Sequence, residues 1–237
     1  MTDSGSRLHH DGQRAYFESA DQPTMLPDET PYSRRHFQRL VEAAALTPGD
    51  RVLEIGSGLG RFTRMFDAAG FRVVASDISP DQIGALKRRF PHIETRVGAA
   101  DELPLTGAPF DAVVGLFMLH HVPDLAAAFK RCAALVKPGG VVSFCEPNAW
   151  YLPVYLQVLL TPRMRWSVER GILNMRPAVL GPALTAAGFR DLSFDYYGLL
   201  PPALYNLGPG RAVESAVAAL PLPAAARAFV LVSARRA

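Results

Sequence analysis

A glycine-rich loop between a short apolar run and a helical pattern constrains the fold most strongly. The sequence Val52-Leu-Glu-Ile-Gly-Ser-Gly-Leu-Gly-Arg-Phe-Thr63 places glycines at positions 56, 58 and 60. Glycine lets the backbone turn sharply and approach a ligand closely, and a helix that starts at the loop offers unbonded N–H groups. The pattern predicts a strand, a ligand-binding loop and a helix in immediate succession.

The spacing of these glycines separates several classes of ligand. A dinucleotide-binding loop has the pattern G-x-G-x-x-G, but Arg61 stands where its third glycine belongs. A P-loop needs a lysine after its last glycine, and this loop has none. Glu54, two residues before the loop, repels a pyrophosphate and suits a cationic ligand. The loop therefore points away from nucleotide phosphates.

From residue 51 onward, short β-branched runs alternate with helical patterns, which is typical of a parallel sheet with crossover helices. Ser79 and Pro80 mark one helix start, as cap and first helical residue. We interpret Lys137–Gly140 as a turn, and Pro182 as the start or a kink of a helix. The predicted strands are Arg51–Gly56, Arg72–Asp77, Ile93–Gly98, Phe110–Phe117, Gly139–Pro147, Asp191–Tyr197 and Ala228–Ala234.

The chain divides into a core and added segments. We predict that residues 1–50 form an N-terminal helical cap. Residues 51–237 are predicted to form one domain, of a size that a single core supports. Two Pro-rich, aromatic and apolar stretches, residues 148–181 and 199–226, interrupt that domain. We expect these two lid segments to cover a substrate.

Acidic residues follow the next two predicted strands. Asp77 ends the second strand, where doubly wound sheets use an acid to accept hydrogen bonds from ribose hydroxyls. Asp101 follows the third strand and is placed to meet the edge of a base. Since parallel strands end at one edge of the sheet, we expect Glu54, the glycine loop, Asp77 and Asp101 to lie close together. A purely structural role for the loop, or a capping role for Asp77, is the alternative.

Four segments in this order resemble class I S-adenosylmethionine-dependent methyltransferases of the small-molecule type. They are VLEIGSGLGRFT, VVASDIS, GAADELPLTGAPFDAVV and LHHVPDLAAAFKRCAALVKPGGVVSFCEPN, and together they cover about residues 51–148. The resemblance implies an α/β, doubly wound, Rossmann-like sheet of seven strands, mostly parallel, with an antiparallel last strand beside the fifth. It also implies S-adenosylmethionine as the cofactor.

The resemblance further assigns the residues that hold the cofactor. Glu54 and the loop from Gly56 to Gly60 would bind its methionine part, Asp77 its ribose, and Ala100 and Asp101 its adenine. Phe117 and Met118 would line the sulfonium. The full set is Glu54, Gly56, Ser57, Gly58, Gly60, Asp77, Ile78, Ala100, Asp101, Phe117 and Met118.

A methyl acceptor with a hydroxyl or ammonium group must lose a proton, and few groups are placed to take it. His120 and His121 follow the fourth predicted strand, histidine titrates near neutrality, and Glu146 ends the fifth strand beside them. These three are the candidate catalytic residues. The alternative is structural, above all for His121, as a residue that opens a helix and bonds backbone groups.

The lid segments suggest the kind of acceptor. Aromatic residues such as Trp150, Tyr155 and Trp166 concentrate in them, together with Leu156, Leu159 and Leu160. We interpret these as the walls of a pocket for an apolar or aromatic metabolite, such as a lipid or a quinone-like compound, against the alternative of plain core.

Composition limits the other classes. The net charge of +3 is spread along the chain, which disfavours nucleic acid as a partner. No apolar run approaches the ~20 residues of a membrane helix, and the N-terminus lacks an apolar core, so no transmembrane segment or signal peptide is expected. Cys132 and Cys145 have no metal-ligand spacing, and no metal is predicted. A cytoplasmic protein is expected. Loose membrane association and the oligomeric state stay open.

The sequence thus predicts an enzyme that transfers the methyl group of S-adenosylmethionine to the oxygen or nitrogen of a small molecule. A non-catalytic, cofactor-binding regulatory module on the same fold is the alternative. A nicotinamide-dependent oxidoreductase is disfavoured by the glycine spacing and by Glu54.

Overall fold

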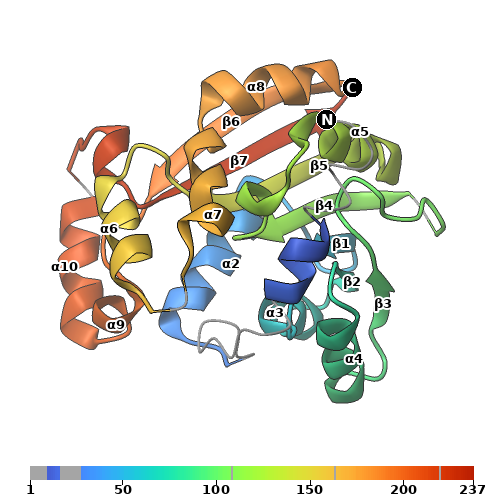
Figure 1. Ribbon diagram of the computed structural model, residues 1–237, viewed down its shortest axis with the longest axis horizontal. Helices are drawn as coiled ribbons and strands as arrows, with labels where there is room; N and C mark the ends of the chain where they lie inside the picture. Colours follow the sequence, from blue (N-terminus) through green and yellow to red (C-terminus); the bar gives the residue numbers. More distant parts are fainter. Residues whose placement is uncertain (1–9, 17–27, 108, 163, 219) are drawn as a thin grey trace.

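The computed structural model describes residues 10–16, 28–107, 109–162, 164–218 and 220–237, and a seven-stranded sheet runs through its middle (Figure 1). The strands are β1 (Arg51–Ile55), β2 (Arg72–Asp77), β3 (Glu94–Val97), β4 (Phe110–Leu116), β5 (Val136–Pro147), β6 (Phe189–Tyr197) and β7 (Phe229–Arg236). Their order is β3-β2-β1-β4-β5-β7-β6. The first five strands in this order, from β3 through β2, β1 and β4 to β5, pair in parallel with their neighbours. Strand β7 lies antiparallel between β5 and β6. The predicted fold class is confirmed.

Helices cover both faces of this sheet. They are the segment at residues 10–16, α2 (Pro31–Ala43), α3 (Arg61–Ala68), α4 (Pro80–Arg89), α5 (Leu125–Leu135), α6 (Leu152–Leu160), α7 (Trp166–Glu169), α8 (Pro177–Ala186), α9 (Pro202–Tyr205) and α10 (Gly208–Ala218). Short 3-10 helices are η2 (Leu119–His121), η3 (Arg170–Asn174) and η4 (Ala224–Ala226). No helix of the described residues is long and apolar enough to span a bilayer.

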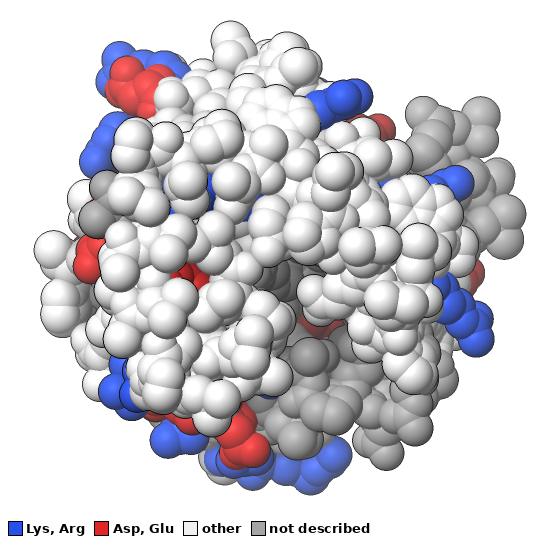
Figure 2. All heavy atoms as spheres, turned by 90° about the vertical axis from the view of Figure 1, so that its left-hand side faces the viewer, with Lys and Arg blue, Asp and Glu red and all other residues white. Residues whose placement is uncertain are grey.

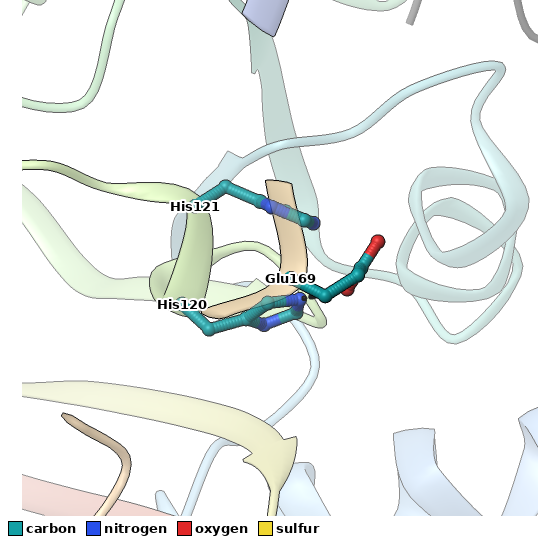
Figure 3. A group of neighbouring side chains, drawn as sticks. All are labelled: His120, His121 and Glu169. Carbon is teal, nitrogen blue, oxygen red and sulfur yellow. Dashed lines mark ion pairs between the residues drawn. The ribbon is translucent and has the colours of Figure 1, made fainter. Parts of the chain in front are cut away.

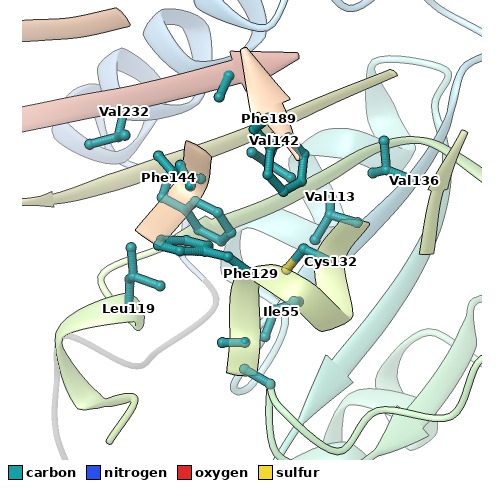
Figure 4. Close-up of a cluster of buried hydrophobic side chains, with 14 of the residues drawn as sticks. Ile55, Val113, Leu119, Phe129, Cys132, Val136, Val142, Phe144, Phe189 and Val232 are labelled. Atoms are coloured by element: carbon teal, nitrogen blue, oxygen red, sulfur yellow. The ribbon is translucent and has the colours of Figure 1, made fainter. Parts of the chain in front are cut away.

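The two core layers follow the period of two in the strands. Leu53 and Val113 point to one face, where α5 and α8 contribute Phe129 and Leu180. Figure 4 shows Val113 and Phe129 in this layer. On the other face, α2, α3 and α4 contribute buried apolar side chains, of which Phe66 is fully buried. The strand order reverses between β1 and β4, which is where sheets of this kind bind ligands.

Local sequence signals explain most element boundaries. The Ser79 hydroxyl accepts a bond from Gln82 N, as its predicted capping role requires. Pro182 lies inside α8, which begins at Pro177, so the alternative that a helix starts at Pro182 is wrong.

The predicted turn at Lys137–Gly140 is also wrong, because β5 begins at Val136 and includes it. Val136 pairs with Phe110 before the register shifts, and Gly139 takes a φ of 73°. The next pair is Ala112 with Val141, so residues 137–140 stand opposite Asp111 alone and form an irregularity inside β5.

Parts of the N-terminal cap and lid segments fall outside the described residues. These parts are 1–9 and 17–27 of the predicted cap, and positions 163 and 219 of the lid segments. Within the cap, α2 packs against β5, β7 and α3.

Candidate active site

The predicted cofactor residues converge at one edge of the sheet. Glu54 lies in β1, Asp77 ends β2, Asp101 follows β3 and Phe117 follows β4. Since β1 pairs in parallel with both β2 and β4, these strand ends are neighbours. The expected meeting of the loop and the acids is therefore present.

The glycine loop has a geometry that other residues do not adopt easily. Gly56, Gly58 and Gly60 have φ values of 72°, 54° and 89°, in the left-handed region. A Cβ at Gly56 would lie 2.6 Å from the Cβ atom of Met118. Gly60 is the residue before α3 and makes no side-chain cap, so the first N–H groups of α3 lie directly at the loop.

Asp77 ties the loop to the next helix. Its Oδ2 accepts a hydrogen bond from Gly58 N at 2.8 Å, and its Oδ1 accepts one from Ser79 N at 2.9 Å. Burial raises the pKa of Asp77, and these backbone bonds oppose the rise. Each carboxylate oxygen has a second lone pair for a ligand hydroxyl.

Glu54 is a second buried acid at the same place. Its Oε2 atom lies 2.5 Å from the Thr63 hydroxyl, and the side chain is 1% exposed. Burial, with Asp77 adding to it, raises the pKa of Glu54 to about 7, although the Thr63 bond lowers it. A cation bound nearby would stabilise the ionised form.

These residues fit a ligand that combines an ammonium group with hydroxyls. The two acids supply carboxylates in a buried environment, and the Ser57 hydroxyl is buried without a hydrogen-bond partner in the described residues. Such an unsatisfied group is costly unless a ligand completes it. S-adenosylmethionine carries an amino group and a ribose diol, which can donate hydrogen bonds to these oxygen atoms. The residues therefore fit that cofactor.

The helical segment at residues 10–16 adds side chains that the sequence did not reveal. His10 Nε2 lies 3.3 Å from Asp101 Oδ1, with both side chains 8% exposed, and Arg14 Nε donates to the Ile78 carbonyl. Ala100, beside Asp101, is buried. No local pattern connects position 10 with position 101, so only the three-dimensional fold shows that this segment lies over the predicted adenine site.

Phe117 and Met118 form the wall beside the loop. Phe117 has a φ of 59°, a costly conformation for an aromatic residue, and its N–H donates to the Cys145 carbonyl at 2.8 Å. Its ring meets the His36 ring edge-on at 5.0 Å between centroids. Outliers of this kind concentrate at functional sites.

Glu146 organises the segment after β4. Its Oε1 accepts hydrogen bonds from Met118 N at 3.0 Å and Leu119 N at 2.7 Å. Its Oε2 lies 2.5 Å from His120 Nδ1. Glu146 is fully buried, so it positions η2 rather than facing solvent.

A second carboxylate, which the sequence interpretation missed, holds the other nitrogen of His120. Glu169 ends α7 in the first lid segment, and its Oε2 lies 3.3 Å from His120 Nε2 (Figure 3). Burial lowers the pKa of His120, but Glu146 and Glu169 outweigh it and raise this pKa to about 9. His120 is therefore a charged imidazolium at neutral pH. Glu169 is the only acid between Glu146 and Asp191, and this isolation in the sequence is the signal by which it could have been found.

His121 has a different environment from its neighbour. It is half-buried, its ring lies 3.9 Å from that of His120, and its Nδ1 lies 3.4 Å from the Val168 carbonyl. A carbonyl only accepts, so this contact favours the proton on Nδ1 of His121.

The three side chains in Figure 3 also have ligand atoms within 4.8 Å of one another, close enough to hold a metal ion. A metal ion would have to displace the proton from His120 Nε2 in order to bind there. The charged form of this cluster is an ion-pair network.

The lid segments depart from the predicted apolar pocket. Trp150 stacks on Tyr196 at 5.7 Å, and Tyr155 meets Trp166 at 5.9 Å, so aromatic residues do pack together. The expectation that Leu156, Leu159 and Leu160 line a pocket is wrong. These three are 58%, 72% and 78% exposed, because α6 turns them outward.

Residues 30–193 match a family model described as a methyltransferase domain. A demethylmenaquinone methyltransferase of Renibacterium salmoninarum is 34% identical over 132 residues, which cover 54% of this chain and 56% of that protein. A ubiquinone biosynthesis O-methyltransferase of Xanthomonas campestris is 34% identical over 113 residues, which cover 46% and 47%. The chain thus spans about half the length of these curated relatives.

The fold is also found among solved structures. A SAM-dependent methyltransferase from Archaeoglobus fulgidus superimposes with a TM-score of 0.62 at 18% identity, over 86% of this chain and 93% of that one.

Proposed function

The chain belongs to the class I S-adenosylmethionine-dependent methyltransferases, and we propose from this membership that it transfers a methyl group to a small apolar or aromatic acceptor. The family predicted from the four sequence segments is confirmed, and with it the predicted enzyme class and cofactor. The acceptor, the site roles and the domain limits are proposals. The observation that carries the activity is the convergence of Glu54, the glycine loop and Asp77 beside Met118.

The cofactor supplies an electrophilic methyl group on a sulfonium, and the chain supplies its binding site. Glu54 and the loop hold the ammonium end, and Asp77 accepts from the ribose hydroxyls. Asp101 meets the adenine once His10 yields its contact. Met118 and Phe117 form the wall at the methyl position, supported by the close approach of Met118 to Gly56.

His121 takes the acceptor's proton in this proposal. An acceptor O–H or N–H gives its proton to the His121 imidazole, which leaves a lone pair on the oxygen or nitrogen. The bound cofactor would supply the methyl group, and its carbon–sulfur bond would break with the electron pair left on sulfur. His120 contributes as a fixed charge, because Glu146 and Glu169 engage both of its ring nitrogens. Glu146 and Glu169 are positioning residues, which hold η2 and α7 in place around the two histidines.

The lid segments indicate the acceptor class. Residues 148–181 bring α7 against η2, and the same segment contributes Trp150, paired with Tyr196, and Tyr155, paired with Trp166. The two curated relatives are named for quinone substrates. A phenolic or quinone-like metabolite is therefore the proposed acceptor. Residues 1–50 are the proposed cap, residues 51–237 the proposed methyltransferase domain, and the cytoplasm the proposed location.

A product assay tests the proposal. The full chain is incubated with S-adenosylmethionine and a panel of hydroquinones, catechols and soluble amines, and S-adenosylhomocysteine is quantified. We expect turnover with aromatic hydroxyl acceptors. Cofactor binding without turnover on any acceptor would favour the non-catalytic module instead.

A further inference from the structure

Helix α6 carries its apolar stripe on the side that faces solvent. Leu152, Leu156, Leu159 and Leu160 recur at the helical spacing of one face and are 73%, 58%, 72% and 78% exposed. Val158 is the buried residue of this helix. A surface helix of a globular protein usually turns its apolar stripe toward the core, so the apolar face of α6 has the opposite orientation.

Two more leucines are exposed on the same side of the molecule (Figure 1). Leu204 in α9 and Leu207 after it are 50% and 57% exposed. In Figure 1, α6, α9 and α10 lie on the same side of the molecule, and Figure 2 shows that side almost without charged atoms over a broad area. We call Leu152, Leu156, Leu159, Leu160, Leu204 and Leu207 the outer apolar face. Contiguous apolar patches of this kind mark interaction sites.

The charges of the lid segments have one sign on the outside. Their only acids are Glu169 and Glu214, which are 7% and 6% exposed. Glu169 contacts His120, and Glu214 forms an ion pair with Arg35. Arg165, Arg170 and Arg176 are exposed. The lid segments therefore present leucines and arginines outward, and no exposed carboxylate among their described residues.

We propose that the outer apolar face docks on the surface of a bilayer that contains anionic phospholipids. Leucine side chains on one helix face enter the boundary between headgroups and acyl chains, and arginines bind the phosphates. Both tryptophans of the chain, Trp150 and Trp166, lie in the same lid segment and are 43% and 42% exposed. Tryptophan is enriched at the level of the headgroups.

The charge pattern disfavours a second copy of the chain as the occupant. A two-fold dimer would place this face against itself. The exposed Arg165 and Arg170, at the α7 segment that packs on α6, would then approach their counterparts with no exposed carboxylate of the lid segments to pair with. Docking would also bring the outer wall of the reaction centre to the bilayer, since α6 packs on α7, which holds Glu169 at His120. The docking does not depend on the proposed reaction.

Vesicle co-sedimentation of the full chain, without cofactor, tests the proposal. Phosphatidylcholine vesicles are compared with vesicles that contain about 30% phosphatidylglycerol. The test variant is Leu156→Glu with Leu159→Glu. The control is Leu105→Glu, which charges an exposed leucine in the loop before β4. We expect wild type to bind anionic vesicles at least about tenfold more tightly than neutral ones, the test variant to lose about tenfold or more, and the control to match wild type.

Tryptophan emission of wild type gives a second measurement that needs no variant. Docking moves Trp150 and Trp166 into a less polar environment, so anionic vesicles should shift their emission to the blue. The proposal is overturned if wild type shows neither sedimentation nor a shift. It is also overturned if the test variant binds like wild type, or if wild type forms a dimer that this variant dissociates while vesicles leave both unbound. Calorimetry with S-adenosylhomocysteine on the same samples reports the cofactor site separately.

Discussion

His120 Nδ1 lies 2.5 Å from Glu146 Oε2, and its Nε2 lies 3.3 Å from Glu169 Oε2, so one imidazolium joins β5 to the first lid segment. His120 and Glu146 are 6% and 0% exposed. A buried charge flanked by two acids is stabilised only while all three groups stay together. The arrangement fixes η2, which also carries His121.

The charge on His120 predicts a pH dependence of stability. The pKa of His120 rises from 6.5 to about 9 in the fold, so its contribution is full below pH 6.5 and is lost as the pH rises through about 9. The shift corresponds to about 3 kcal/mol. Urea unfolding between pH 6 and 10 measures it. Glu169→Gln should move the decline to lower pH, and His92→Gln, at an exposed histidine, should leave it unchanged.

Glu54 should exchange stability for binding. Its pKa rises from 4.5 to about 7, so the stability it provides is present below pH 4.5 and lost as the pH rises through about 7. Glu54→Gln keeps the shape and avoids the buried charge, so at pH 8 it should stabilise the free protein by about 3 kcal/mol.

The same variant should bind S-adenosylmethionine at least about tenfold more weakly, because it lacks the carboxylate for the ammonium group. Thermal unfolding and calorimetry on one preparation measure both effects. A variant that gains stability and keeps full affinity would remove Glu54 from the site.

Gly56→Ala should be far more harmful than Gly139→Ala. Both glycines have a φ near +70°, but a Cβ at Gly139 meets nothing within 4 Å, whereas one at Gly56 meets Met118 at 2.6 Å. The left-handed backbone costs about 1 kcal/mol in either variant. The clash at Gly56 adds about 1–3 kcal/mol. Denaturant unfolding compares the two, and equal losses would show that Met118 simply moves away.

His121→Asn should lower kcat by about 10²–10⁴-fold and leave cofactor affinity unchanged, because it removes the proposed proton acceptor. His92→Asn is the matched control at an exposed histidine. A steady-state assay with the best acceptor of the panel measures kcat. If His121→Asn keeps its kcat, proton removal is done elsewhere or is not needed.

The sequence predicted the sheet well because its strands carry local signals. Strands β1, β2 and β4 are β-branched runs with glycines close by in the sequence. Such local patterns can be recognised without knowledge of the tertiary contacts. The early start of β5 escaped prediction because Val136 is held by its pairing with Phe110, a partner 26 residues away.

The candidate site divides in the same way. Gly56 follows β1, and Asp77 and Glu146 lie at the carboxyl ends of β2 and β5, so topology alone places them at one edge. Glu169 and His10 come from segments without a periodic signal, and their contacts with His120 and Asp101 span long stretches of chain. The outward turn of α6 was missed because an apolar helix has the same sequence whether its leucines enter a pocket or face outward.

Calorimetric titration of S-adenosylmethionine and S-adenosylhomocysteine into wild type, Asp77→Asn and Asp81→Asn tests the cofactor site most directly. Asp77 is buried and ties the loop to α4, whereas Asp81 is an exposed acid four residues on. We expect wild type and Asp81→Asn to bind each ligand at one site per chain. Asp77→Asn should lose at least about tenfold in affinity. Wild type that binds neither ligand, or an Asp77→Asn variant that binds both like wild type, would contradict it.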